Sequence, residues 1–82
     1  MRISNESITS RYFQAFEELK TMGKIESIQG FCREFGIDKR NFYQQRADVS
    51  RNIIKADWLA YLVSEYGISA RWLLTGFGSM LA

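Results

Sequence analysis

Gly36 divides the stretch FCREFGIDKRNFYQQR, residues 31–46, into two short segments that differ in character. The segment before the glycine is mostly apolar, whereas the one after it carries long side chains that form hydrogen bonds. A glycine at such a position typically ends one helix, and Asp38, two residues further on, is a suitable cap for the next. Ile37 between them is expected to fill the core. The sequence therefore predicts two short helices joined by a forced turn, and this pair restricts the fold more than any other feature.

Apolar residues at helical spacing continue on both sides of this pair. Serines at positions 7, 27 and 69 are predicted N-caps, either Ser50 or Asn52 starts the fourth helix, and Arg11 is placed on the exposed side of the first. No segment shows the alternation typical of a strand, so residues 1–82 are expected to form one compact all-α domain with a short tail after its last helix. The five predicted helices span residues 7–22, 27–35, 38–46, 52–66 and 69–75.

Composition excludes most kinds of catalytic and metal site. The chain has no histidine and a single cysteine, Cys32, which leaves out the usual zinc sites and the Ser/His and Cys/His nucleophile systems. Its nine acidic residues are scattered, and no two of them are marked out as an acid and a base. We therefore expect a protein that is not an enzyme and that uses no cofactor or metal.

The sequence also carries no signal for a membrane or for export. No apolar run is long enough to span a bilayer, and the polar N-terminal stretch MRISNESITS lacks the apolar segment of a signal peptide. A single cysteine cannot form an intramolecular disulfide, which fits a reducing compartment. A cytoplasmic protein without membrane contact is expected.

Positive charge is concentrated in one part of the chain. The formal net charge is only +2, yet residues 39–55 alone sum to +4, while the segments before and after them each sum to −1. A basic stretch is more often just a solvated surface than a nucleic-acid contact. Here, however, it begins with the helix that follows the Gly36 turn, and this coincidence favours contact with a nucleic acid.

The spacing around Gly36 resembles that of a known DNA-binding motif. A small residue stands four positions before the glycine, and apolar residues stand five and one before it and one and six after it. The residues concerned are Phe31, Cys32, Phe35, Ile37 and Phe42. A second pattern closes the chain and consists of Trp72, Leu73, Leu74, Gly76, Gly78 and Met80. Together they resemble the lambda-repressor-like helix-turn-helix family (XRE or Cro/repressor type), in particular short phage-repressor-like regulators, over residues ~7 to 80.

Two residues depart from the family pattern. Gln45 stands nine residues after Gly36, where the family usually has an aliphatic side chain, so Phe42 is expected to anchor this helix almost alone. Ile28 stands where the family often has a glutamine that contacts a phosphate, so Ser27 or Gln29 would take over that contact.

The resemblance implies a sequence-specific regulator of transcription, in particular a repressor, that binds double-stranded DNA through the second helix of the motif. Arginine and lysine can donate to guanine, and glutamine can pair with adenine, whereas Tyr43 belongs either to the edge of the core or to the interface. The implied base contacts are Lys39, Arg40, Tyr43 and Gln44. The implied contacts to the DNA backbone are Ser27, Gln29, Asn41, Arg46, Arg51 and Lys55.

The resemblance also implies a homodimer on a palindromic operator, because two half-sites about one helical turn apart suit a two-fold dimer. Trp72 is expected mainly in the core, but the end of the chain also offers a possible dimer surface. That surface consists of Trp72, Phe77, Met80 and Leu81. An alternative is a protein-interaction module on the same fold, antirepressor-like or scaffolding, in which this surface works and the basic helix does not bind DNA.

Overall fold

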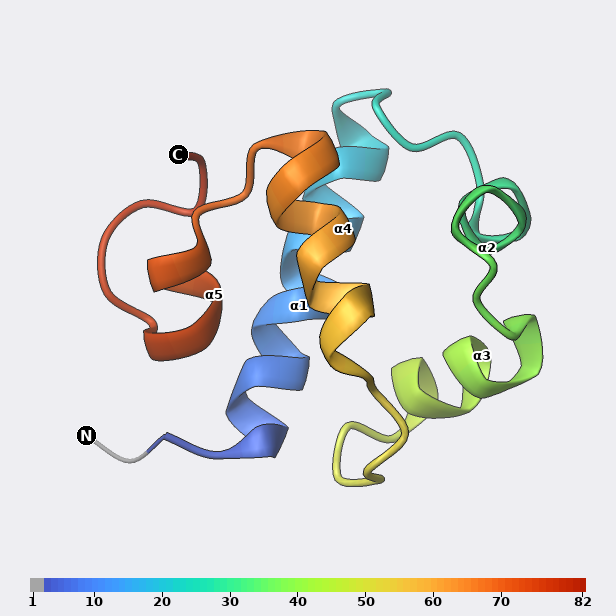
Figure 1. Cartoon of the computed structure of the whole chain (residues 1–82), viewed down its shortest axis with the longest axis horizontal. Helices are drawn as coiled ribbons and strands as arrows, with labels where there is room; N and C mark the ends of the chain where they lie inside the picture. The colour runs from blue at the N-terminus through green and yellow to red at the C-terminus, as the bar shows by residue number, and fades with distance from the viewer. Residues whose placement is uncertain (1–2) are drawn as a thin grey trace.

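A computed structural model describes residues 3–82, and this range forms five α-helices without a strand, as predicted for an all-α chain. The helices α1 and α4 contact each other through the middle of the molecule, with α2 and α3 on one side and α5 on the other (Figure 1). In chain order they are α1 (Asn5–Thr21), α2 (Ile28–Phe35), α3 (Lys39–Ala47), α4 (Ala56–Tyr66) and α5 (Ala70–Thr75).

Most of the predicted helix ends are confirmed by their capping hydrogen bonds. Ser27, Asp38 and Ser69 each accept a hydrogen bond from a backbone N–H of the first turn that follows. The prediction that Ser7 caps the first helix is wrong, because the cap is Ser4. The Ser4 hydroxyl accepts from the backbone N–H of Ser7 at 3.1 Å, and Ser7 in turn accepts from the backbone of Ser4, so α1 begins at Asn5.

The fourth helix begins later than predicted, at Ala56 rather than at residue 52, and neither Ser50 nor Asn52 caps it. Residues 48–55 form a loop instead. Side chains from the end of α3 explain this, since Asp48 accepts from the backbone N–H of Ser50, and Gln45 accepts from those of Ile53 and Ile54. These backbone N–H groups already have side-chain acceptors, so they do not need the hydrogen bonds of a helix and the segment can remain a loop.

Aromatic rings fill the core between α1, α2, α3 and α4. Phe42 of α3 is fully buried at the centre of these rings, and the centroids of its neighbours lie 5.2 to 6.4 Å from its own. All five of these pairs are tilted or edge-on rather than stacked face to face, and aromatic side chains disfavour that face-to-face arrangement. This aromatic cluster consists of Tyr12, Phe13, Phe16, Phe31, Phe42 and Trp58.

The last helix is held to α1 by a charged group. The guanidinium of Arg11 donates to the carbonyl oxygens of Leu73 and Leu74 at 2.9 and 3.2 Å, which satisfies free carbonyls at the end of α5. The prediction that Arg11 faces away from the molecule is therefore wrong. The tail returns beside this helix, because the N–H of Ser69 donates to the carbonyl oxygen of Met80 at 2.8 Å. Within residues 3–82, no helix has the length and apolar character that a membrane span requires.

Candidate nucleic-acid interface

The connection between α2 and α3 is three residues long and tightly fixed. Gly36 has a φ of 66°, in the left-handed region that favours glycine, and so ends α2 without strain. The backbone N–H of Ile37 donates to the carbonyl oxygen of Cys32 at 2.9 Å, and the Ile37 side chain is buried in the core. Asp38 then accepts from the N–H of Asn41 at 3.0 Å and starts α3. Backbone, core and cap together therefore determine the direction in which α3 leaves the turn.

One face of α3 is buried and the opposite face is open to solvent. Phe42 and Gln45, three residues apart, are both fully buried and hold the helix against the rest of the molecule. Lys39, Arg40 and Tyr43 are exposed, with Tyr43 at 46%. The helix contains no acidic residue, so its open face carries positive charge and neutral polar groups only.

Gln45 is a buried anchor, which corrects the expectation that Phe42 would hold α3 almost alone. Its side-chain oxygen accepts from the backbone N–H groups of Ile53 and Ile54 at 2.8 and 2.6 Å. Its amide nitrogen donates to the carbonyl oxygen of Asp48 at 3.0 Å. A polar side chain thus occupies a position where an aliphatic one was expected, and it is stabilised there by hydrogen bonds rather than by apolar packing.

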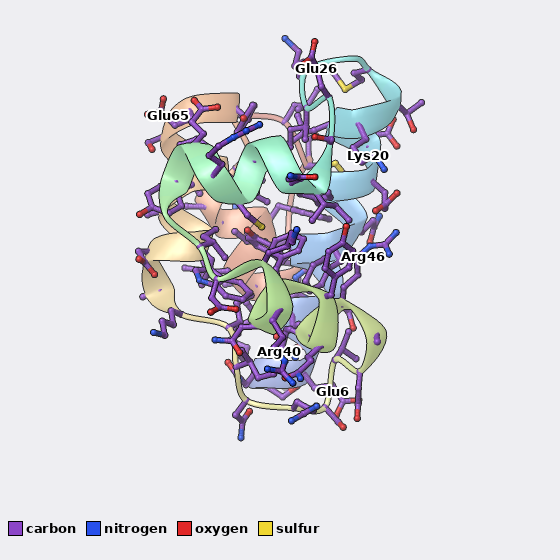
Figure 2. All side chains as sticks on the ribbon, turned by 90° about the vertical axis from the view of Figure 1, so that its right-hand side faces the viewer. Glu6, Lys20, Glu26, Arg40, Arg46 and Glu65 are labelled. Atoms are coloured by element: carbon purple, nitrogen blue, oxygen red, sulfur yellow. The ribbon has the colours of Figure 1, made fainter. Side chains whose placement is uncertain are left out.

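The four predicted base-contacting residues lie on α3, with Lys39, Arg40 and Tyr43 exposed and Gln44 half-buried. Figure 2 views this side of the molecule and shows Arg40 projecting from the lower side of α3, towards the end of the molecule where the loop of residues 48–55 runs. Within the part of the chain that the structure describes, none of these four side chains is hydrogen-bonded or ion-paired to another protein group. Their polar groups are therefore free for an external partner.

The residues predicted to contact the DNA backbone differ from one another in exposure and in their protein partners. Ser27 caps α2, Gln29 is exposed near its start, and Asn41 is half-buried. The Arg46 guanidinium, on the upper side of α3 in Figure 2, forms an ion pair with Glu17 of α1 at 3.0 Å, and the sequence did not predict this partner. Glu17 and Arg46 are 29 positions apart, so no local pattern indicated the pair.

Two predicted backbone-contacting residues, Arg51 and Lys55, are exposed on the loop between α3 and α4. The loop also carries Asp48, whose pKa is lowered mainly by hydrogen bonds from the side chain and backbone of Ser50. Glu6 of α1 lies at the same end of the molecule as Arg40, whereas Glu26 and Glu65 lie at the opposite end (Figure 2). Glu26 and Glu65 are therefore distant from the open face of α3, whereas Asp38 and Asp48 flank the helix itself.

The possible dimer surface is divided between core and surface. Trp72 is only 9% exposed and belongs to the core, so it is not part of an open surface. Phe77 and Leu81 are about half exposed, Met80 is half-buried against the core, and Leu74 adds a further exposed apolar side chain. They lie on α5 and the tail, away from α2 and α3 (Figure 1).

Three other features bear on whether residues 3–82 hold a chemical site. Within residues 3–82, no group of three or more His, Cys, Asp or Glu side chains is arranged to hold a metal. A half-open cavity of about 370 Å³ beside the start of α2 is lined by Phe31, Tyr66 and two glutamates, Glu26 and Glu34. Burial raises the pKa of the Cys32 thiol, which is therefore a weak nucleophile.

Comparison of the chain with protein-family models, with curated proteins and with solved structures gave no significant match.

Proposed function

We propose that this protein binds double-stranded DNA in a sequence-specific manner and regulates transcription as a repressor. In this proposal α2, the Gly36 turn and α3 act as a helix-turn-helix of the lambda-repressor-like type, and α3 enters the major groove. One observation supports it most. The helix is fixed by its buried face, while its open face carries basic and amide side chains without partners in the described residues.

The dimensions of α3 suit this role. Its nine residues correspond to a helix about 13 Å long at 1.5 Å per residue. An α-helix with its side chains is about 10–12 Å across, which fits the width of about 12 Å of the major groove of B-DNA. A short helix can therefore lie in the groove with the side chains of its first two turns at the base edges. Rigid support matters for such contacts, because a displacement of the helix would misplace every donor at once.

The exposed side chains match the hydrogen-bonding groups of base edges. Lys39 and Arg40 would donate to the O6 and N7 atoms of guanine, and Gln44 would pair with adenine through its amide. Tyr43, which is 46% exposed, would contact a thymine methyl group or a phosphate. Contacts of Arg51 and Lys55 with phosphates would fix the orientation of the protein on the duplex.

A second copy of the chain is part of this proposal. A single short helix gives modest affinity, and two copies related by a two-fold axis would bind a palindrome with half-sites about 34 Å apart. Leu74, Phe77 and Leu81 supply exposed apolar area for association, since each is at least 42% exposed.

The same apolar side chains favour the alternative function, a protein-interaction module without affinity for DNA. The two functions differ in what salt does. DNA binding should weaken steeply as salt rises, with a slope of about −0.9 in log K against log salt for each phosphate contact. Association through Leu74, Phe77 and Leu81 would show little of this dependence, because it rests on apolar contact.

Selection of bound sites from a pool of random duplex DNA tests the proposal. Recovery of a palindrome is the expected result, and Lys39→Ala and Arg40→Ala should each weaken binding to it. Lys24→Ala is a matched control, because its side chain is exposed and lies outside α3 and its loop. Absence of binding at low salt, or equal effects of the test and control variants, would contradict DNA binding by α3.

A further inference from the structure

Gln45 forms a hydrogen-bonded joint between the end of α3 and the loop that follows it. This polar joint consists of the Gln45 side chain and the backbone groups of Asp48, Ile53 and Ile54. The Gln45 side chain is fully buried, and three bonds of 2.6 to 3.0 Å use its oxygen twice and its nitrogen once. One amide therefore connects both ends of the loop to α3.

The polar joint also reaches Arg51. The carbonyl oxygen of Asp48 accepts from the Gln45 amide nitrogen at 3.0 Å and from the backbone N–H of Arg51 at 3.2 Å. The Asp48 carboxylate in turn holds Ser50, accepting from its hydroxyl at 2.6 Å and from its backbone N–H at 3.0 Å. Arg51 thus stands in a turn whose first residue is bonded directly to Gln45.

An aliphatic side chain at position 45 would fill the same space but would leave the loop unattached. It has no acceptor for the N–H groups of Ile53 and Ile54 and no donor for the Asp48 carbonyl. Groups that are left without partners in a partly buried place favour a conformation that exposes them to water. Within residues 3–82, a further side-chain bond ties the loop to α1, in which Asn5 donates to the exposed Asn52 side chain at 2.8 Å. The polar joint is therefore the inner support of the loop.

We propose that Gln45 is a positioning residue for DNA binding, which sets the place of Arg51 relative to Lys39 and Arg40. The basic groups of the loop and of α3 would then meet one duplex as a single rigid unit. This inference rests on the proposed function, and it assigns to Gln45 a role beyond holding α3 against the core.

The first measurement concerns the protein alone. Amide hydrogen exchange followed by NMR should show Ile53 and Ile54 exchanging at least about tenfold faster in Gln45→Leu than in the wild type, because both lose their acceptor. Gln45→Glu keeps an acceptor for the two N–H groups but, when ionised, has no donor for the Asp48 carbonyl, so it should retain more of the protection than Gln45→Leu. If Gln45→Leu does not fold, Gln45→Met, which is unbranched and similar in length, takes its place. Unchanged exchange in the folded variant would overturn the inference.

The second measurement uses a mixed-sequence duplex of 30 base pairs as the probe. In the wild-type background, Arg51→Ala should make the negative slope of log K against log salt shallower by about 0.9, the value for one phosphate contact. In the Gln45→Leu background, Arg51→Ala should change the slope little, since Arg51 is no longer held in place. Arg40→Ala is the control, and its effect should be the same in both backgrounds.

The outcomes separate the inference from the function on which it rests. An equal effect of Arg51→Ala in both backgrounds, with binding intact, would mean that Gln45 only stabilises the fold and would overturn the inference alone. A wild-type protein that does not bind the duplex at low salt would refute the proposed function, and the inference with it. Loss of the Arg51 effect together with a constant Arg40 effect would support both.

Discussion

The start and the end of α3 are held by different kinds of interaction. At the start, the Gly36 turn, the Asp38 cap and the Phe42 ring fix the helix through backbone geometry and apolar packing. At the end, Gln45 holds the following loop by three hydrogen bonds, and Arg46 forms an exposed ion pair with α1. Apolar packing resists displacement of a whole helix, whereas hydrogen bonds specify the conformation of one loop. The start of α3 is therefore held by packing and turn geometry, whereas the end both anchors the helix through Gln45 and sets the conformation of the loop beside it.

Phe42→Ala should have the largest effect on the interactions that hold the start of α3. The ring is fully buried among five other aromatic rings, so its removal leaves a large cavity. We expect the free energy of unfolding to fall by about 3–5 kcal/mol, as measured by urea denaturation. A loss below about 1 kcal/mol would show that the start of α3 depends on its turn and cap instead.

Arg40→Ala tests the open face at the same end of the helix. The Arg40 side chain is exposed and without a protein partner in the described residues, so the free energy of unfolding should not change. The binding free energy for a selected operator should fall by about 1–3 kcal/mol, with relaxed preference at one base pair. Titration of the operator and of single-base variants measures both. If the variant unfolds more easily than the wild type, Arg40 also contributes to the stability of α3, and its effect on DNA binding is not separate from its effect on the fold.

Gly36→Ala tests the contribution of the turn before α3 separately from that of the Phe42 ring. A Cβ atom at this position meets nothing within 4 Å, so the only cost is that of the left-handed backbone conformation at φ 66°. The free energy of unfolding should fall by about 1–2 kcal/mol, which denaturation of the variant beside the wild type would show. No loss at all would mean that the turn contributes nothing that Phe42 does not already supply.

Tyr12→Phe tests whether packing alone holds the aromatic cluster. The Tyr12 hydroxyl is buried and has no hydrogen-bond partner within the described residues, so its removal should raise the free energy of unfolding by about 1 kcal/mol. Burial also raises the pKa of this hydroxyl above its ordinary value of 10.0. Wild-type stability is therefore expected to be constant with respect to this group below pH 10 and to decline above it, because only the unfolded state ionises there. Thermal unfolding of both proteins across this range should show a weaker decline for the variant, and a destabilised variant would contradict the interpretation.

Glu17→Gln should have the smallest effect and concerns the end of α3. Both side chains of the ion pair with Arg46 are substantially exposed, so its loss should change stability by less than about 1 kcal/mol. The released Arg46 would become available to a phosphate, which should steepen the salt dependence of duplex binding by about 0.9 in slope. Glu18→Gln is a matched control, since Glu18 is exposed on α1. An equal change in both variants would show that only net charge matters.

The start of α3 was predictable because its signals are local. Gly36, Asp38 and Phe42 lie within seven residues, and each has a conformational preference or apolar character that acts at short range. The exposure of Lys39 and Arg40 follows from the helical period once Phe42 is known to be buried. The five-helix order was predictable for the same reason.

The end of α3 was not predictable in this way. The partners of Gln45 are backbone groups eight and nine positions further along, and a glutamine carries no sequence signal for such a role. The same bonds explain why the start of α4 was predicted too early, because they hold residues 53 and 54 outside a helix. The Ser4 cap was missed because Ser7, three residues later, is an equally suitable residue for the same position.

The Cys32 thiol can be used to measure how readily the core around α2 and α3 opens. It is the one cysteine of the chain, it is buried beside the turn, and its backbone carbonyl accepts from Ile37. A thiol reagent can therefore reach it only in molecules where the core around Cys32 has opened, and the rate of labelling reports how readily that opening occurs. Comparing that rate with and without duplex DNA would report how far DNA binding suppresses this opening.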